Sequence, residues 1–330
     1  MSLHVSGLAT ARARGLAAMA INTTFAADVI AGLTHQPKYL APKYFYDAAG
    51  SQLFEEITRL PEYYPTRTEL GILHDHARKI AGFVPDGAAL VEFGAGATTK
   101  VRLLLERGDL AGRLGAYVPV DISGDFLRQQ AQELARDLPQ LRVLPVAADF
   151  TASFALPQEI AGMPRVGFFP GSTLGNFEPR DAGAFLRGAR AILGDGARLI
   201  IGIDLEKAVS LLEPAYDDAA GVTARFNLNL LTRINRELGG DFELSAFTHR
   251  ALYRADRHRI EMHLVSRTAQ TVHLLGRSIA FRSGESIHTE NSYKYSLARF
   301  AALARDAGWT SLQSWTDAER LFAVHVLGVS

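Results

Sequence analysis

The sequence predicts an α/β protein: a doubly wound parallel sheet, with a second α+β domain inserted before the sheet is complete. Three observations carry this prediction. Strand-like and helix-like segments alternate from about residue 88 to residue 203. A long helical stretch and a set of alternating segments then interrupt the rhythm, and a helix with two strand-like segments ends the chain. A chain of 330 residues is long enough for two cores.

The alternating region begins with an apolar run at residues 88–93 that Gly94 terminates. The other strands expected in this region span 117–120, 141–146, 166–169 and 197–203. The helices expected between them follow Thr98 and cover 123–138 and 181–193. Strands separated by helices are typical of a parallel sheet whose two faces are both covered.

The remaining segments complete the architecture. Residues 211–238 are expected to be one helical stretch, and 247–281 an antiparallel set of strands. Residues 293–307 are expected to be helical, and 309–315 and 322–329 to form a terminal hairpin. Five parallel strands followed by an antiparallel last strand are the layout of a Rossmann-like class I methyltransferase sheet.

Two expected domains follow from this layout. The sheet domain, which would bind the cofactor, comprises residues 70–205 and 291–330. The inserted domain, which would bind the substrate, comprises 15–69 and 206–290, because the first seventy residues do not follow the strand and helix rhythm.

Composition excludes several classes of partner. Lys and Arg number 35 and Asp and Glu number 35, so there is no excess positive charge to hold nucleic acid or an anionic membrane. No apolar run approaches the length of a membrane span. The basic residues at 11–14 are interpreted as a solvated tail, and 12–20 is too weakly apolar for a signal peptide. The absence of cysteine excludes thiolate chemistry and fits the cytoplasm.

The ten histidines show no spacing typical of a metal site. Five of them lie among the expected strands without a paired ligand spacing: His249, His258, His263, His273 and His288. Structural or solvent-exposed roles are therefore expected for them, and no metal is predicted.

Candidate ligand-binding residues follow the expected strands, because open parallel sheets bind ligands beyond the carboxyl ends of their strands. Gly94 and Gly96 allow a sharp turn and close approach of a ligand. Thr99 stands where a dinucleotide fingerprint has its third glycine, which weakens the case for NAD or FAD. Asp121 follows the second strand and can accept both hydroxyls of a ribose; alternatively it caps the next helix.

Two further strand ends carry similar features. Asp149 can accept from an adenine amino group while Phe150 provides an apolar face; a loop aspartate with a core phenylalanine is the alternative. Asn176 follows the fourth strand, where its amide oxygen can accept from an amine and orient it. Thr173 occupies the place of a nucleophilic serine, so a hydrolase is not supported.

Longer motifs extend over nearly the whole chain, from about residue 25 to the end. They lie at residues 42–47, 60–69, 171–176, 215–223, 235–238 and 289–292. Together they resemble the L-histidine Nα-methyltransferases of ergothioneine biosynthesis.

The resemblance implies roles for matching residues. Those that would contact S-adenosylmethionine are Gly94, Lys100, Asp121, Asp149 and Phe150. Those that would hold the amino and carboxylate ends of the amino acid are Tyr46, Tyr63, Asn176 and Tyr216. Those around the imidazole would be Met262, Glu290 and Ser292. Glu290 and Ser292 would select histidine, since an aromatic side chain without an N–H donor leaves Glu290 unpaired.

The activity implied is trimethylation of the α-amine of L-histidine to hercynine, the first step of ergothioneine biosynthesis. Asn176 would orient the amine and Tyr46 would be its hydrogen-bonding partner. One alternative acceptor is another aromatic amino acid or derivative, since relatives methylate an indole amino acid derivative. Another alternative is a non-catalytic S-adenosylmethionine-binding protein. The expected protein is a cytoplasmic monomer with a small-molecule substrate, without nucleic acid or membrane partners.

Overall fold

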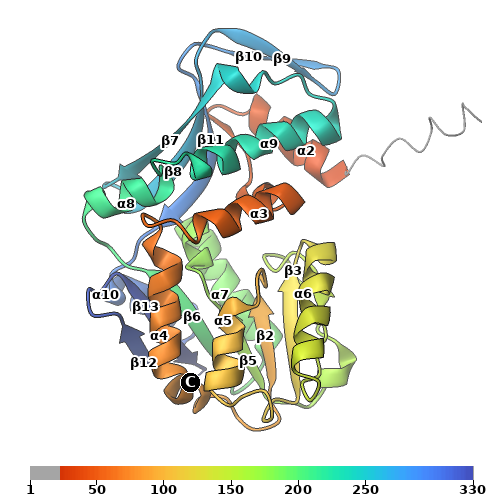
Figure 1. Cartoon of the computed structure of the whole chain (residues 1–330), viewed down its shortest axis with the longest axis vertical. Coiled ribbons are helices and arrows are strands. Elements are labelled where there is room, and N and C mark those ends of the chain that lie inside the picture. The colour runs from red at the N-terminus through yellow and green to blue at the C-terminus, as the bar shows by residue number, and fades with distance from the viewer. Residues whose placement is uncertain (1–22, 330) are drawn as a thin grey trace, which may run out of the picture.

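The computed structural model describes residues 23–329 and has two domains, one above the other in Figure 1. The segments interpreted as a basic tail (11–14) and as too weak for a signal peptide (12–20) lie outside the described residues, as does the expected start of the inserted domain at residue 15. No helix in the described part of the chain combines the length and apolar character that crossing a bilayer requires.

The lower domain contains a seven-stranded sheet in the order β12-β13-β6-β5-β2-β3-β4. Its strands are β2 (Ala89–Phe93), β3 (Ala116–Asp121), β4 (Val146–Ala147), β5 (Arg165–Phe169), β6 (Arg198–Asp204), β12 (Thr310–Thr316) and β13 (Phe322–Gly328). Strands β2 to β6 are parallel, whereas β13 pairs antiparallel with β6. The predicted doubly wound methyltransferase sheet is thus confirmed.

Helices cover both faces of this sheet (Figure 1). They are α4 (Tyr64–Ala81), α5 (Thr99–Arg102) with the π-helical turn Leu103–Arg107, α6 (Gly124–Asp137), α7 (Pro179–Leu193) and α10 (Leu297–Asp306). Val91 and Phe93 of β2 lie in a core with α7 and α10. Leu90 lies in a second core with α4, α5 and α6, because successive strand residues alternate between faces.

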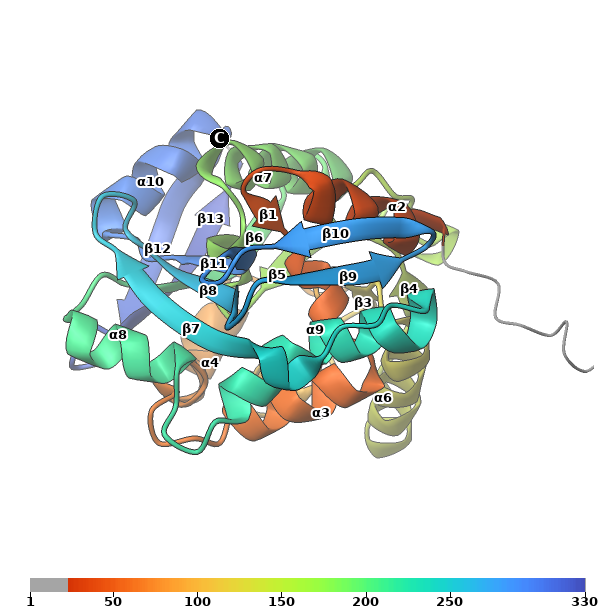
Figure 2. The same ribbon diagram turned by 90° about the horizontal axis from the view of Figure 1, so that it is seen from above.

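The upper domain has a four-stranded sheet in the order β1-β11-β8-β7 and a separate hairpin. The strands are β1 (Lys38–Tyr39), β7 (Phe247–Arg254), β8 (Arg259–Ser266), β9 (Gln270–Leu274), β10 (Arg277–Phe281) and β11 (Ser286–Tyr293). The helices are α2 (Thr23–Thr34), α3 (Ala48–Ile57), α8 (Val209–Tyr216) and α9 (Val222–Leu238). Figure 2 shows α3 and α9 side by side beneath this sheet and hairpin.

Three predicted elements were wrong in extent. Of the segment 141–146, only Val146 belongs to a strand, β4, and Val143 forms an isolated bridge with Tyr117, because Pro145 between them has no N–H for the sheet. The single helix at 211–238 is two helices, α8 and α9, separated around Gly221, whose φ is +69°. The helix expected from residue 293 starts at Leu297, and the preceding residues finish β11, a strand that the sequence analysis missed.

The chain passes between the domains three times, near residues 58–63, 205–208 and 294–296. Helix α4 spans the expected domain boundary at 69/70, and β11 spans the boundary at 290/291. The second and third passages are joined by a parallel bridge between Leu205 and Tyr295. The two domains therefore meet along paired backbone segments.

Glu92 in β2 gives a testable feature of the sheet, because its carboxyl group is buried and accepts a hydrogen bond from the Tyr117 hydroxyl. Burial raises the pKa of Glu92 from 4.5 to about 8. The unfolded chain ionises this group at lower pH than the folded protein does. The contribution of Glu92 to the free energy of unfolding should therefore fall as the pH rises from about 4.5 to about 8.

We expect Glu92→Gln to stabilise the protein, with an advantage that grows from about pH 5 to about pH 8 and reaches roughly 2 kcal/mol or more. Urea denaturation at several pH values measures it. The control is Glu106→Gln, at a glutamate whose side chain is 54% exposed. An equal pH trend in both variants would show that burial of Glu92 is not the cause.

Candidate functional site

The carboxyl ends of β2 and β3 point toward the upper domain (Figure 1), so the strand-end residues face the inserted elements. Close packing joins the two sides. A Cβ on Gly175, in the loop after β5, would lie 2.9 Å from the carbonyl oxygen of Tyr293 in β11. Only glycine permits this approach. The loop that carries Asn176 is thus held directly against the strand that carries Glu290 and Ser292.

The turn after β2 exposes backbone where a cofactor is expected. Gly94 has φ of +72°, and the N–H groups of Gly94 and Ala95 both donate to the carbonyl oxygen of Val120, at 2.8 and 3.0 Å. The ring of Phe150 lies 3.3 Å from the position of a Cβ on Gly94. A side chain at Gly94 would therefore meet Phe150 and strain the turn.

Asp121 and Asp149 both accept hydrogen bonds from residues close to them in the chain. Asp121 Oδ1 accepts the N–H of Ser123 at 2.7 Å, and burial raises the pKa of Asp121. Asp149 Oδ1 accepts both the N–H and the hydroxyl of Thr151. A carboxylate has about four lone-pair sites, so these bonds leave acceptor capacity for a ligand's hydroxyl or amino groups.

Lys100 is fixed by a buried carboxylate that the sequence analysis did not identify. Its Nζ lies 2.7 Å from Glu69 of α4, and the N–H of Gly171 donates to both Glu69 oxygens at 2.9 Å. A Cβ on Gly202 would lie 2.1 Å from Glu69 Oε1, so glycine at this point of β6 makes room for the carboxylate. Glu69 thereby ties α5 to the loop after β5.

The three tyrosines expected at the amino acid's polar ends share one aromatic cluster. Phe54 packs edge-on against Tyr46 and Tyr63, at centroid distances of 5.7 and 6.2 Å, and Tyr63 packs against Tyr216 at 6.1 Å. Burial, and then the charge of Glu290, raise the pKa of Tyr46 well above its ordinary value. These phenols are therefore neutral at physiological pH and can donate hydrogen bonds.

The Asn176 side chain is presented at the end of a short 3-10 helix, Thr173–Asn176. This helix starts from Ser172, whose φ is +56°. Neither the Asn176 amide nor the hydroxyls of Tyr46 and Tyr63 hydrogen-bond to any other group in residues 23–329. Their hydrogen-bonding capacity is available to a ligand.

The expected imidazole residues lie on β8 and β11. Glu290 pairs with Met262 across these strands, and a bulge at Thr289, whose hydroxyl bonds the Met262 carbonyl at 3.0 Å, sets the face on which Glu290 and Ser292 lie. Within the described chain, no group donates a hydrogen bond to the Glu290 carboxyl, and burial raises its pKa to about 8. Ser292 differs, because its oxygen lies 2.7 Å from the Tyr216 hydroxyl.

A buried charged group, the crossover cluster, lies where the three passages meet and consists of Tyr64, Asp204, Lys207 and Lys294. Asp204 accepts from Tyr64 at 2.7 Å, Lys207 at 2.5 Å and Lys294 at 2.7 Å. The sequence analysis assigned no role to any of the four residues, although Tyr64 lies in the motif at 60–69. Asp204 ends β6, so the strand-end rule that flagged Asp121 would also have flagged Asp204.

The upper sheet brings together three potential metal ligands, Glu261, His263 and His288, whose ligand atoms lie within 4.8 Å of one another. Sequence spacing did not reveal this group, because His263 and His288 come from paired strands. Arg259 also pairs with Glu261 at 2.5 Å, and its positive charge opposes a bound cation. The absence of a metal stays a prediction.

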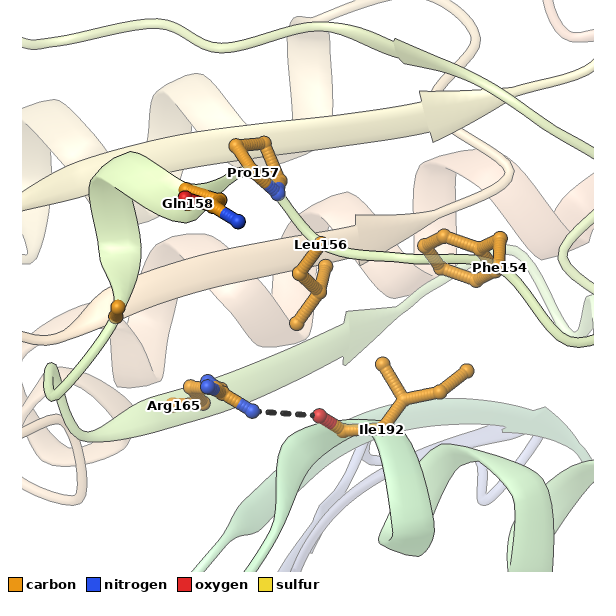
Figure 3. Close-up of a pocket in the computed structure, with 7 residues that line it drawn as sticks. Phe154, Leu156, Pro157, Gln158, Arg165 and Ile192 are labelled. Atoms are coloured by element: carbon orange, nitrogen blue, oxygen red, sulfur yellow. Dashed lines mark hydrogen bonds between the residues drawn. The ribbon is translucent and has the colours of Figure 1, made fainter.

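A pocket of about 440 Å³, drawn in Figure 3, is lined by none of the candidate site residues. Arg165, the first residue of β5, borders it and donates to the carbonyl of Ile192 near the end of α7, at 2.9 Å. The pocket therefore lies near the amino end of β5, whereas the candidate site lies at the carboxyl ends of the strands.

Comparisons with known proteins cover both domains. A family model described as histidine-specific, S-adenosylmethionine-dependent methyltransferase matches residues 25–329. Histidine N-alpha-methyltransferase of Mycolicibacterium smegmatis is 42% identical over 296 residues, or 88% of this chain and 90% of that protein. The protein of the same name from Mycobacterium tuberculosis is 39% identical over 88% of this chain and 90% of its own. Ergothioneine biosynthesis protein 1 of Neurospora crassa is 31% identical, over 89% of this chain and 33% of that protein.

Proposed function

Since the chain belongs to the family of S-adenosylmethionine-dependent, histidine-specific methyltransferases, we propose that it transfers three methyl groups in sequence to the α-amine of L-histidine. The product is hercynine, and the reaction is the first step of ergothioneine biosynthesis. We place the enzyme in the cytoplasm, as a monomer acting on free histidine.

The observation that carries this substrate is the Glu290 carboxyl, which is partly buried on β11 and accepts no hydrogen bond from another group of the described chain. A ligand that covers this carboxyl and supplies a hydrogen-bond partner binds more favourably than one that covers it and leaves it unpaired. An imidazole has one N–H donor and one acceptor nitrogen, and the side chain of phenylalanine has neither. Glu290 therefore favours histidine over aromatic amino acids that leave it unpaired.

The residues at the strand ends fit S-adenosylmethionine. Gly94 presents backbone without a side chain, and the Asp121 carboxylate has acceptor capacity for two ribose hydroxyls. Asp149 and Phe150 would take the adenine, and Lys100 would contact the cofactor from the first turn of α5. The cofactor supplies a methyl group already activated on a sulfonium, so the protein needs to supply no covalent intermediate.

The chain's own residues then have to position a neutral amine. The Asn176 amide oxygen accepts an amine N–H and aims the nitrogen lone pair. Tyr46 hydrogen-bonds the same group, and water takes the released proton. As methyl groups accumulate, the nitrogen becomes a permanent cation, which the faces of Tyr46 and Tyr63 attract.

The direct test is mass spectrometry of the purified protein incubated with S-adenosylmethionine and each amino acid in turn. A mass gain of three methyl groups on histidine alone supports the proposal. Methylation of tryptophan instead would keep the enzyme class and replace the substrate. Cofactor binding by calorimetry without methylation of any amino acid would favour a non-catalytic binding protein.

A further inference from the structure

Lys294 is fully buried directly after β11, two residues beyond Ser292. Its ammonium donates to Asp204 Oδ2 at 2.7 Å, to Ser292 Oγ at 2.7 Å and to the Tyr216 hydroxyl oxygen at 2.9 Å. A lysine ammonium has three N–H donors, so these bonds use all of them. Lys294 must therefore act on a ligand through its neighbours.

The hydroxyl groups of Tyr216 and Ser292 have two O–H donors between them, and their contacts determine how many remain for a ligand. The Tyr216 and Ser292 oxygens each accept from Lys294 and lie 2.7 Å apart, so one hydroxyl donates to the other. One O–H of the pair is then left for a ligand. We propose that Lys294 is a positioning residue that holds Ser292 as donor to Tyr216, so that the Tyr216 O–H is directed at the carboxylate of the bound amino acid. This inference rests on the proposed function.

The rest of the crossover cluster keeps Lys294 in place. Asp204 is held by Tyr64 and Lys207, and its backbone N–H donates to Ser172 Oγ at 2.9 Å. Ser172 begins the loop that ends at Asn176.

The test is calorimetric binding of histidine to the complex with S-adenosylhomocysteine. Lys294→Met should raise the Kd for histidine by about 30-fold, as expected for a charge-assisted hydrogen bond. The affinity for S-adenosylhomocysteine should stay within about two-fold, because the cofactor residues lie elsewhere. Histamine, which lacks the carboxylate, should lose less than about three-fold.

The matched control is Lys207→Met, which removes the other ammonium from Asp204 without touching Tyr216 or Ser292. Its Kd for histidine should change less than about three-fold. A double-mutant cycle adds a readout that a general structural role would not move. In a Tyr216→Phe background the Lys294→Met substitution should have little further effect on histidine binding, because the hydroxyl through which it acts is gone.

Three results would overturn the inference: an unchanged Kd in Lys294→Met, equal losses in both lysine variants, or a full effect of Lys294→Met without the Tyr216 hydroxyl. If Lys294→Met loses S-adenosylhomocysteine binding through misfolding, Lys294→Gln, which keeps two N–H donors, undergoes the same measurements. Failure of the wild-type protein to bind histidine would instead reject the proposed function, whatever the lysine variants do.

Discussion

Asn176→Ala is expected to slow methylation of histidine by about 100-fold or more, because the amine loses the group that aims its lone pair at the methyl. The affinity for S-adenosylhomocysteine should stay within about two-fold. The Asn176 side chain hydrogen-bonds to nothing else in residues 23–329, so alanine leaves no protein group unpaired and the loop keeps its shape. Single-turnover kinetics at saturating histidine separate the chemical step from binding.

The control for this substitution is Asn291→Ala, which also removes a side-chain amide. Asn291 lies on the face of β11 opposite to Glu290 and Ser292, where its amide donates to Glu178 at 3.1 Å. Its turnover should match that of the wild-type protein. Turnover within about three-fold of wild type in Asn176→Ala would remove Asn176 from the reaction and leave the orientation of the amine to the tyrosines.

The strand-end residues were predictable because of a property of parallel sheets. All strands of a parallel set end at one edge, so Gly94, Asp121 and Asn176 had to lie near one another once the strands were identified. Periodicity and terminating glycines suffice to identify the strands.

The break between α8 and α9 could also have been predicted from the sequence. Gly221 is a helix terminator, and the carboxylate of Asp218 accepts the N–H groups of Val222 and Thr223 at 2.9 and 2.7 Å.

The other half of the site depends on tertiary packing that periodicity does not report. Strand β11 carries Glu290, Asn291 and Ser292, polar residues that oppose a strand prediction, and a bulge at Thr289 changes the face on which they lie. Their assignment came from family resemblance. Lys294 could not be found from local pattern either, since a lysine that follows a strand is ordinarily solvated. Its burial results from the meeting of three chain passages.

Replacing Glu290 by alanine is expected to lower kcat/KM for histidine by about 100-fold or more, because the imidazole then enters a site without its hydrogen-bonding partner. The loss for phenylalanine should be much smaller, or a gain, since its side chain has no N–H donor and no longer leaves a carboxyl unpaired. The ratio of kcat/KM for histidine to that for phenylalanine, measured by mass spectrometry of competing substrates, reports the change directly.

Glu290→Gln is the matched variant, because it keeps the size of the side chain and one carbonyl acceptor. It should retain more histidine selectivity than Glu290→Ala, since an imidazole N–H still finds an acceptor. It should also change how histidine binding responds to pH. Burial raises the pKa of Glu290 to about 8 while Lys294 opposes the shift, so the wild-type carboxyl ionises as the pH rises through about 8 and the amide does not. A histidine preference that is the same in the wild-type, Gln and Ala proteins would mean that selection rests on the shape of the site around Met262 rather than on the carboxyl of Glu290.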